Sequence, residues 1–133
     1  MSHESDIYLA KSLESLRGAE SEFANGRLNN SANRAYYSCF QAAIAALLQE
    51  DVRLADRGRP WGHAYVQAQF VGQLINRRKR YPSDLRDTLA RCLMLRQTAD
   101  YQPDTVTEIR ALRAFQRAQA FVEAVHPKGG EKR

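Results

Sequence analysis

The sequence predicts an all-α protein. Apolar residues recur at three- and four-residue spacing along nearly the whole chain, glycine and proline fall in a few short breaks, and no segment shows the alternation typical of a strand. With 133 residues, of which 44% are hydrophobic and 26% charged, the chain is long enough for one hydrophobic core and too apolar for a disordered protein. We expect one helical domain over residues 1–127, followed by a charged, disordered tail over residues 128–133.

Two helices are predicted in the first half of the chain. The first covers residues 6–24 and ends at Asn25-Gly26, which is a typical C-terminal cap. Its apolar face is formed by Leu9, Leu13, Leu16 and Phe23. The second covers residues 31–49, and the Asn and Ser residues just before and at its start are expected to cap it. This helix carries the fewest charges, so we expect it to be the most buried.

A loop over residues 50–60 leads to a third predicted helix over residues 61–76. The loop carries Arg53, Arg57 and Arg59, and the helix ends in the run Arg77-Arg78-Lys79-Arg80. This run complements the helix dipole and is typical of a solvated helix end. Alternatively, it forms a basic RNA-binding surface with the loop arginines, with Tyr81 available to stack on a base.

The last two helices have clear sequence boundaries. Ser83 is expected to cap the fourth, which continues to about Asp100 and cannot extend through Pro103. The fifth begins at Thr105-Val106-Thr107-Glu108, which fits the capping-box pattern. Its apolar stripe consists of Ala111, Ala114, Phe115, Ala118, Val122 and Val125.

The composition favours a cytoplasmic protein with an anionic partner. The net charge is +5, and arginine, whose planar fork suits phosphate, outnumbers lysine. No stretch is apolar enough to span a membrane, and the N-terminus lacks the pattern of a signal peptide. Cys39 and Cys92 lie on apolar stripes without partners at metal-ligand spacing, so we expect free, buried thiols. No metal site and no cofactor signature is predicted.

The fourth predicted helix carries an arginine on its apolar stripe. Continuing the series Leu89 and Cys92 by four residues reaches Arg96, which is costly to bury unless it is paired. Asp100, one turn further on, can accept its hydrogen bonds, and Tyr101 closes the helix beside them. The sequence leaves two interpretations open: a structural ion pair at the helix end, or a phosphate-facing site.

A second polar cluster lies at the start of the second predicted helix. Asn33, Arg34 and Tyr37 are expected to form a polar ridge on its less buried side. Such a ridge can hold a nucleotide or a partner helix.

These two clusters carry a family resemblance. The segment Asn33-Arg34-Ala35-Tyr36-Tyr37-Ser38-Cys39-Phe40-Gln41-Ala42-Ala43, followed by Leu95-Arg96-Gln97-Thr98-Ala99-Asp100-Tyr101, resembles the HEPN superfamily, in particular its small stand-alone bacterial and archaeal members. The resemblance covers roughly residues 5–125. It implies an up-down bundle of four to five helices, usually a homodimer, in which the helix-four arginines of two subunits lie close together in a cleft.

The resemblance also bears on activity. Many HEPN proteins are metal-independent ribonucleases that use an arginine followed four to six residues later by a histidine. Arg96 matches that arginine, but Tyr101 stands where the histidine is expected, and a tyrosine with an ordinary pKa near 10 is a poor general base. His63 is interpreted as a polar residue at a helix start. Some HEPN toxins are silenced by a partner nucleotidyltransferase that adds adenylate to a tyrosine, a part that Tyr101 can play.

Three functions follow as hypotheses. The leading one is a HEPN protein that binds RNA or a nucleotide, through Arg96, Asp100 and Tyr101 together with the ridge and the basic run Arg77, Arg78 and Arg80. In this hypothesis it acts with a nucleotidyltransferase in a toxin–antitoxin or defence system. The alternatives are a non-catalytic dimerisation or adaptor module and a metal-independent endoribonuclease. A DNA-binding regulator is disfavoured because no helix-turn-helix pattern is present.

Overall fold

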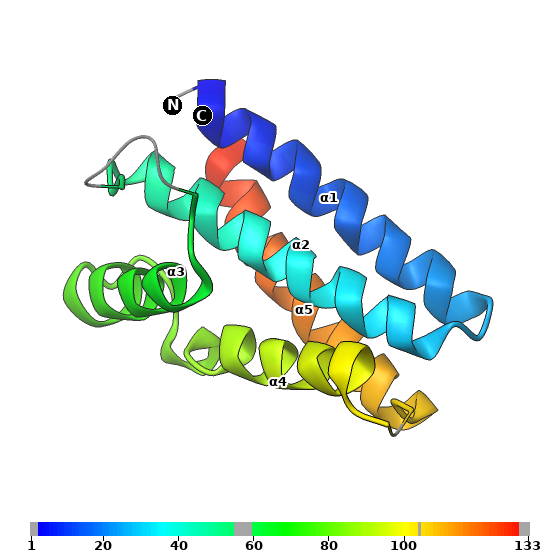
Figure 1. Ribbon diagram of the computed structural model, residues 1–133. Coiled ribbons are helices and arrows are strands. Elements are labelled where there is room, and N and C mark those ends of the chain that lie inside the picture. Colours follow the sequence, from blue (N-terminus) through cyan, green and yellow to red (C-terminus); the bar gives the residue numbers. More distant parts are fainter. Residues whose placement is uncertain (1–2, 55–59, 104, 131–133) are drawn as a thin grey trace.

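The computed structural model describes residues 3–54, 60–103 and 105–130, and every regular element in them is helical. The elements in chain order are α1 (His3–Ala24), α2 (Leu28–Gln49), α3 (His63–Gln69), the π-helical η1 (Phe70–Arg77), the 3₁₀ turn η2 (Ser83–Leu85), α4 (Thr88–Tyr101) and α5 (Glu108–Gly130) (Figure 1). The prediction of an all-α bundle is confirmed. Arg57 and Arg59 of the predicted basic loop lie outside the described residues.

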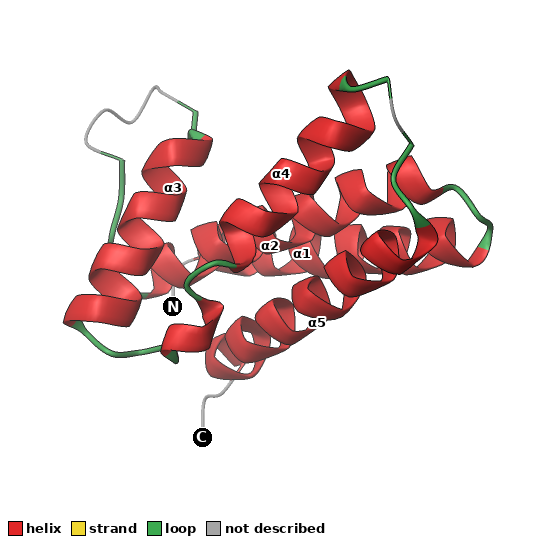
Figure 2. Cartoon of the chain, turned by 90° about the horizontal axis from the view of Figure 1, so that it is seen from below, coloured by secondary structure: helices red, strands yellow, loops and turns green. Residues whose placement is uncertain are grey.

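Helix α2 is the centre of the bundle. It packs against α1, α4 and α5, and α3 lies at one end of the bundle in both views (Figures 1 and 2). The run from Ala42 to Leu48 is buried on all sides, as expected for the helix with the fewest charges. Because α2 touches so many neighbours, residues along it reach elements that are distant in the sequence.

The interface between α1 and α2 is built from small residues. The buried positions of α1 are Ser5, Leu9, Ser12, Ser15 and Ala19. The predicted apolar face is therefore only partly correct, because Leu13, Leu16 and Phe23 are half-buried at its margin. Serine and alanine let the two backbones approach closely, and Ser5 Oγ donates a 3.2 Å hydrogen bond to the carbonyl of Ala45 on α2.

Ser31 does not cap α2, contrary to the prediction. The helix begins one turn earlier, at Leu28, and Ser31 is buried within it, where its hydroxyl donates a 2.8 Å hydrogen bond to the Ala19 carbonyl of α1. Asn29 Oδ1 accepts from the backbone N–H of Val106, ahead of α5, at 3.0 Å. Both side chains bond to another segment of the chain and do not cap α2.

Two other predicted helix starts are displaced. Ser83 opens the short turn η2, and α4 begins only at Thr88. At α5 the capping threonine is Thr107, whose hydroxyl accepts from the backbone N–H of Arg110 at 3.3 Å, and not Thr105. The predicted end of α4 is correct: Gln102, which precedes Pro103, is extended, with φ −95° and ψ 153°.

The core between η1 and α5 is aromatic. Phe70 and Phe121 are fully buried with ring centroids 4.9 Å apart, and Tyr81 lies 5.3 Å from Phe70. The predicted stripe of α5 is confirmed, with only Phe115 left half-buried. Phe121 was not in the predicted stripe, although it lies one turn from Val125 on the same face.

The described elements also bear on the chain end and on membranes. Helix α5 extends to Gly130, beyond the predicted domain boundary at residue 127, and residues 131–133 of the predicted tail lie outside the described part. Among the helices of the described residues, none combines the length and apolar character required to cross a bilayer.

Candidate functional site

Arg96 of α4 lies among three tyrosine rings. Its guanidinium carbon is 5.2 Å from the ring centroid of Tyr37, 5.7 Å from that of Tyr36 and 5.9 Å from that of Tyr101. A guanidinium within about 6 Å of an aromatic centroid is attracted by the negative face of the ring. With 14% of its side chain exposed, Arg96 is held largely out of water but retains access to it.

Asp100 is the ionic partner of Arg96. Arg96 Nε and Asp100 Oδ2 are 3.2 Å apart, as the spacing of four residues predicts. This Nε–H nevertheless has no hydrogen-bond partner among the described residues, so the contact satisfies the distance but not the direction of a hydrogen bond. The pair is therefore held by charge, and the guanidinium is not saturated by its neighbours.

The polar ridge on α2 reaches the same site. Asn33 Nδ2 donates a 2.9 Å hydrogen bond to Asp100 Oδ2, and Arg34 donates a 2.9 Å bond to Asn33 Oδ1. The Arg34 guanidinium lies 5.5 Å from the centroid of Tyr37. The two clusters that the sequence suggested separately thus form one surface, with a chain of polar contacts running from α2 to α4.

His63, the first residue of α3, joins the site through Tyr36. Its Nδ1 is hydrogen-bonded to the Tyr36 hydroxyl, and its ring centroid lies 4.9 Å from that of Phe40. Burial and the charge of Arg96 lower the pKa of His63, so the neutral imidazole is favoured. Burial raises the pKa of Tyr36, which keeps its phenol protonated. His63 is indeed a polar residue at a helix start, as predicted, but its contacts with Tyr36 and Phe40 were not predicted.

The chemistry of this cluster suits an anion. It presents two arginines, one amide, one exposed phenol and one neutral imidazole within a single surface of α2, α3 and α4. Tyr101 is 71% exposed at the end of α4, so its hydroxyl is accessible. In the described part of the chain, no group of three or more His, Cys, Asp or Glu residues is placed to hold a metal ion.

The basic run at the end of η1 lies elsewhere. Arg78 donates a 2.7 Å hydrogen bond to the Glu50 carbonyl, and Arg80 Nε is 2.8 Å from Glu50 Oε2. Glu50 follows the C-terminus of α2, about 20 Å along the helix axis from Tyr36 at a rise of roughly 1.5 Å per residue. The structure therefore does not bring Arg77, Arg78 and Arg80 to Arg96. The suggestion that Tyr81 stacks on a base is wrong, because Tyr81 is only 6% exposed.

The two cysteines lie between α2 and α4. Cys39 and Cys92 are both buried and free, as predicted, and their thiols are hydrogen-bonded to one another. Burial raises the pKa of the Cys39 thiol well above its usual value. The pair is thus part of the core beneath Arg96 and not a reactive site.

Comparison with known proteins agrees with this architecture. A search of curated proteins found no match. The family model described as the HEPN domain matches residues 5–129, which includes α2, α3 and α4, nearly all of α1 and α5, and every residue named above around Arg96. The chain therefore belongs to the HEPN family.

Proposed function

We propose that this HEPN protein binds RNA or a nucleotide, with a phosphate on Arg96. The observation that supports this most strongly is the state of the Arg96 side chain: it is 14% exposed, lies among three tyrosine rings, and its terminal nitrogens make no hydrogen bond with the described residues. An arginine that served only to neutralise Asp100 would be expected to donate directional hydrogen bonds to it. Here the Nε–H is buried, whereas the two terminal nitrogens stay available to a phosphate.

The neighbours of Arg96 support the same ligand. Asn33 and Arg34 add an amide and a second guanidinium beside it, so the site holds two guanidinium groups against the one carboxylate of Asp100. The tyrosine rings exclude water from one side of the cation, which strengthens its attraction to an anion.

Binding is tested with a fluorescent single-stranded oligoribonucleotide and the purified full chain. Arg96→Gln is expected to weaken binding about tenfold or more, and to reduce the slope of log K against log salt by about 0.7, the value for one lost phosphate contact to a single strand. Arg91→Gln is the matched control: Arg91 is exposed on α4, and the substitution removes the same charge. If both substitutions weakened binding equally, the RNA would be held only by nonspecific attraction to the positive charge of the protein, which would contradict the proposal.

The adaptor alternative makes a different prediction. If Arg96 is only structural, Arg96→Ala should lower the melting temperature, because Asp100 loses its charged partner and the three tyrosine rings lose the guanidinium they contact. A normal melting temperature combined with lost RNA or nucleotide binding would rule the adaptor alternative out.

A ribonuclease remains the second candidate, and His63 is the observation that favours it. In the tautomer whose Nδ1–H donates to the Tyr36 hydroxyl oxygen, Nε2 of a neutral His63 can accept the proton of a ribose 2′-hydroxyl. The 2′-oxygen then attacks phosphorus, the bond to the 5′-oxygen breaks, and the 5′-oxygen takes up a proton from the protonated His63 or from water, which gives a 2′,3′-cyclic phosphate and a 5′-hydroxyl. Arg96 would stabilise the charge on the phosphoryl oxygens. Failure of the wild-type protein to cut any RNA without metal, tRNA included, would exclude this activity.

We also propose a nucleotidyltransferase as the partner protein, in a toxin–antitoxin or defence system. The exposed Tyr101 hydroxyl beside Arg96 supports it as the acceptor: the phenol oxygen attacks the α-phosphate of ATP and pyrophosphate leaves. Incubation with a nucleotidyltransferase and ATP should add the mass of one adenylate to the wild type and none to Tyr101→Phe. Modification of Tyr101→Phe to the same extent would contradict this assignment.

A homodimer through α4 completes the proposal. Met94 is 67% exposed and lies on the side of α4 that faces away from α2, whereas Arg96 faces the α2 tyrosines. Burying Met94 against a second copy would form a twofold dimer through α4 and leave Tyr101, at the helix end, accessible. Sedimentation should show a dimer for the wild type and a monomer for Met94→Glu. A wild type that sediments as a monomer would contradict the dimer.

A further inference from the structure

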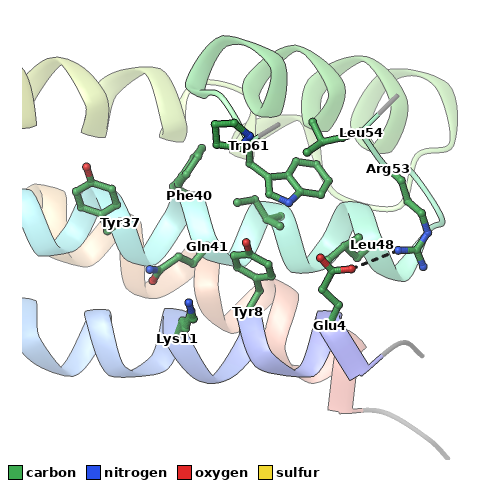
Figure 3. A pocket seen from close by; sticks show the side chains of 12 residues that line it. Glu4, Tyr8, Lys11, Tyr37, Phe40, Gln41, Leu48, Arg53, Leu54 and Trp61 are labelled. Carbon is green, nitrogen blue, oxygen red and sulfur yellow. Dashed lines mark ion pairs between the residues drawn. The ribbon is translucent and has the colours of Figure 1, made fainter. Parts of the chain in front are cut away.

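A groove runs along α2 from the Arg96 site. Its volume is about 660 Å³, which lies within the range of small-molecule sites. Figure 3 shows Tyr37 at one end of it and Arg53 at the other, with Phe40 and Trp61 along its length and Tyr8 facing them from α1. Tyr37 to Leu48, the stretch of α2 that lines it, is about 16 Å long at a rise of roughly 1.5 Å per residue.

We propose that this groove holds the base and ribose of the nucleotide whose phosphate lies on Arg96. The inference rests on the proposed function and deepens it, because it assigns a second subsite and a direction to the bound nucleotide. A ligand that occupied both places would be anchored by charge at one end and by stacking along the rest.

The first argument is the kind of side chain in the groove. Tyr8, Phe40 and Trp61 come from α1, α2 and the segment before α3, and each is half-buried with part of its ring accessible. Bases bind to proteins by stacking on such aromatic faces. Gln41 adds an amide at the floor of the groove, beside Tyr8 (Figure 3). Its amide nitrogen lies within hydrogen-bonding distance of Ser15 Oγ and of the Tyr37 and Lys11 carbonyls, so its amide oxygen is the atom left to accept from a base edge.

The second argument is the continuity of the groove with the phosphate site. Tyr37 lines the groove and also lies 5.2 Å from the Arg96 guanidinium, so one side chain borders both. The groove and the Arg96 site are therefore neighbours along α2 and can be filled by one molecule.

The third argument is the distribution of charge. Arg53 at the far end is paired with Glu4 at 3.5 Å, as the dashed line in Figure 3 shows, so its charge is largely neutralised there. Lys11 lies nearer the Tyr37 end, with its ammonium 5.6 Å from the Tyr8 centroid. Asp100 offsets the charge of Arg96 in the same way, but Arg34 and Lys11 have no ion pair among the described residues. Net positive charge therefore lies toward the Tyr37 end of the groove, which orients the phosphate to that end and the base toward Trp61.

The single tryptophan provides the test, because Trp61 is the only one in the sequence and lines the groove. The full chain is titrated with adenosine and uridine 5′-monophosphates, the two free nucleosides, and ribose 5-phosphate, following tryptophan fluorescence and calorimetry. The monophosphates should bind most tightly and change the emission, the nucleosides should change it at about tenfold or higher concentration, and ribose 5-phosphate should bind without changing it.

A variant separates the groove from the phosphate site. Tyr8→Ala should weaken monophosphate binding by roughly five- to a hundredfold, the range for loss of one stacking partner, and leave ribose 5-phosphate binding unchanged. Ile7→Ala, an exposed neighbour on α1 that does not line the groove, should leave both unchanged.

The outcomes distinguish the two proposals. If ribose 5-phosphate binds as tightly as the monophosphates and Tyr8→Ala has no effect, the groove does not hold the base, while the proposed function at Arg96 stands. If monophosphates move the Trp61 emission but Arg96→Gln binds them as well as the wild type, the groove assignment stands and the phosphate site is wrong. If none of the probes binds, the groove assignment is wrong, and the proposed function also falls if the oligoribonucleotide fails to bind.

Discussion

The Asn33 amide donates a 2.9 Å hydrogen bond to the Asp100 carboxylate, 67 residues away along the chain. This single bond joins the polar ridge of α2 to the arginine site of α4. Because Asp100 also neutralises Arg96, the bond couples the position of the carboxylate to both helices.

The coupling between these two residues is measurable. Asn33→Ala and Asp100→Ala should each destabilise the protein, and the double variant should lose about 1 kcal/mol less than the sum, since the shared bond is counted once. Urea unfolding of the four proteins gives the coupling energy. Asn30→Ala is the control. Asn30 donates to Glu22 and not to Asp100, so its effect on the free energy of unfolding should add to that of Asp100→Ala. A coupling no larger than that of the control would show that the bond contributes nothing in solution.

His63 should make stability depend on pH. Its pKa is lowered below 6.5 in the folded protein, by burial and by Arg96, so the unfolded chain binds the proton more readily. The free energy of unfolding is therefore expected to fall as the pH drops through 6.5, and to level off below the folded pKa. In His63→Gln the free energy of unfolding should not show the decrease that protonation of His63 causes. An NMR titration in which the pKa of His63 lies at or above 6.5 would contradict the prediction, and Arg96→Gln should raise that pKa.

The two thiols should be unreactive in the native state. Burial raises the pKa of Cys39, while the hydrogen bond from Cys39 lowers the pKa of Cys92, but both sulfurs are buried between α2 and α4 and out of reach of a reagent. A chromogenic disulfide reagent is expected to label neither cysteine in the folded protein and both after denaturation. Fast labelling of either thiol under native conditions would show that α4 separates from α2.

Two glycines should respond to alanine with opposite signs. Gly26, in the turn between α1 and α2, has φ +75°, a conformation that costs an alanine about 1–2 kcal/mol although no atom lies within 4 Å of an added Cβ. Gly72, within η1, also has free space but no such backbone, so Gly72→Ala should stabilise the protein by about 0.5–1 kcal/mol. Thermal unfolding of both variants checks this. The same sign for both would refute the backbone argument.

Burial of the aromatic core gives a further prediction. Phe121→Ala should destabilise the protein by about 3–5 kcal/mol, because it removes a fully buried ring that packs on Phe70. Ile109→Ala, at a 53% exposed position of the same helix, is the matched control and should change stability little. Chemical denaturation distinguishes them, and comparable losses would mean that the η1–α5 core is loosely packed.

Much of the helical framework could be predicted from the sequence alone, because helices are signalled locally. The three- and four-residue spacing identified α1, α2, α4 and α5, and Pro103 fixed where α4 stops. The pairing of Arg96 with Asp100 was predictable for the same reason, since residues four apart share a helix face.

What only the tertiary structure decided are the contacts between helices. Ser31 is a residue type that often caps helices, but here its hydroxyl donates to the Ala19 carbonyl. Tyr81 is a residue type that can stack on a base, but here it is buried against Phe70. His63 meets Tyr36 and Asn33 meets Asp100 because α2 packs against both α3 and α4. The sequence by itself thus determined which residues are helical and which carry charge or hydrogen-bonding groups. Their partners depend on how the helices pack, which no local spacing encodes.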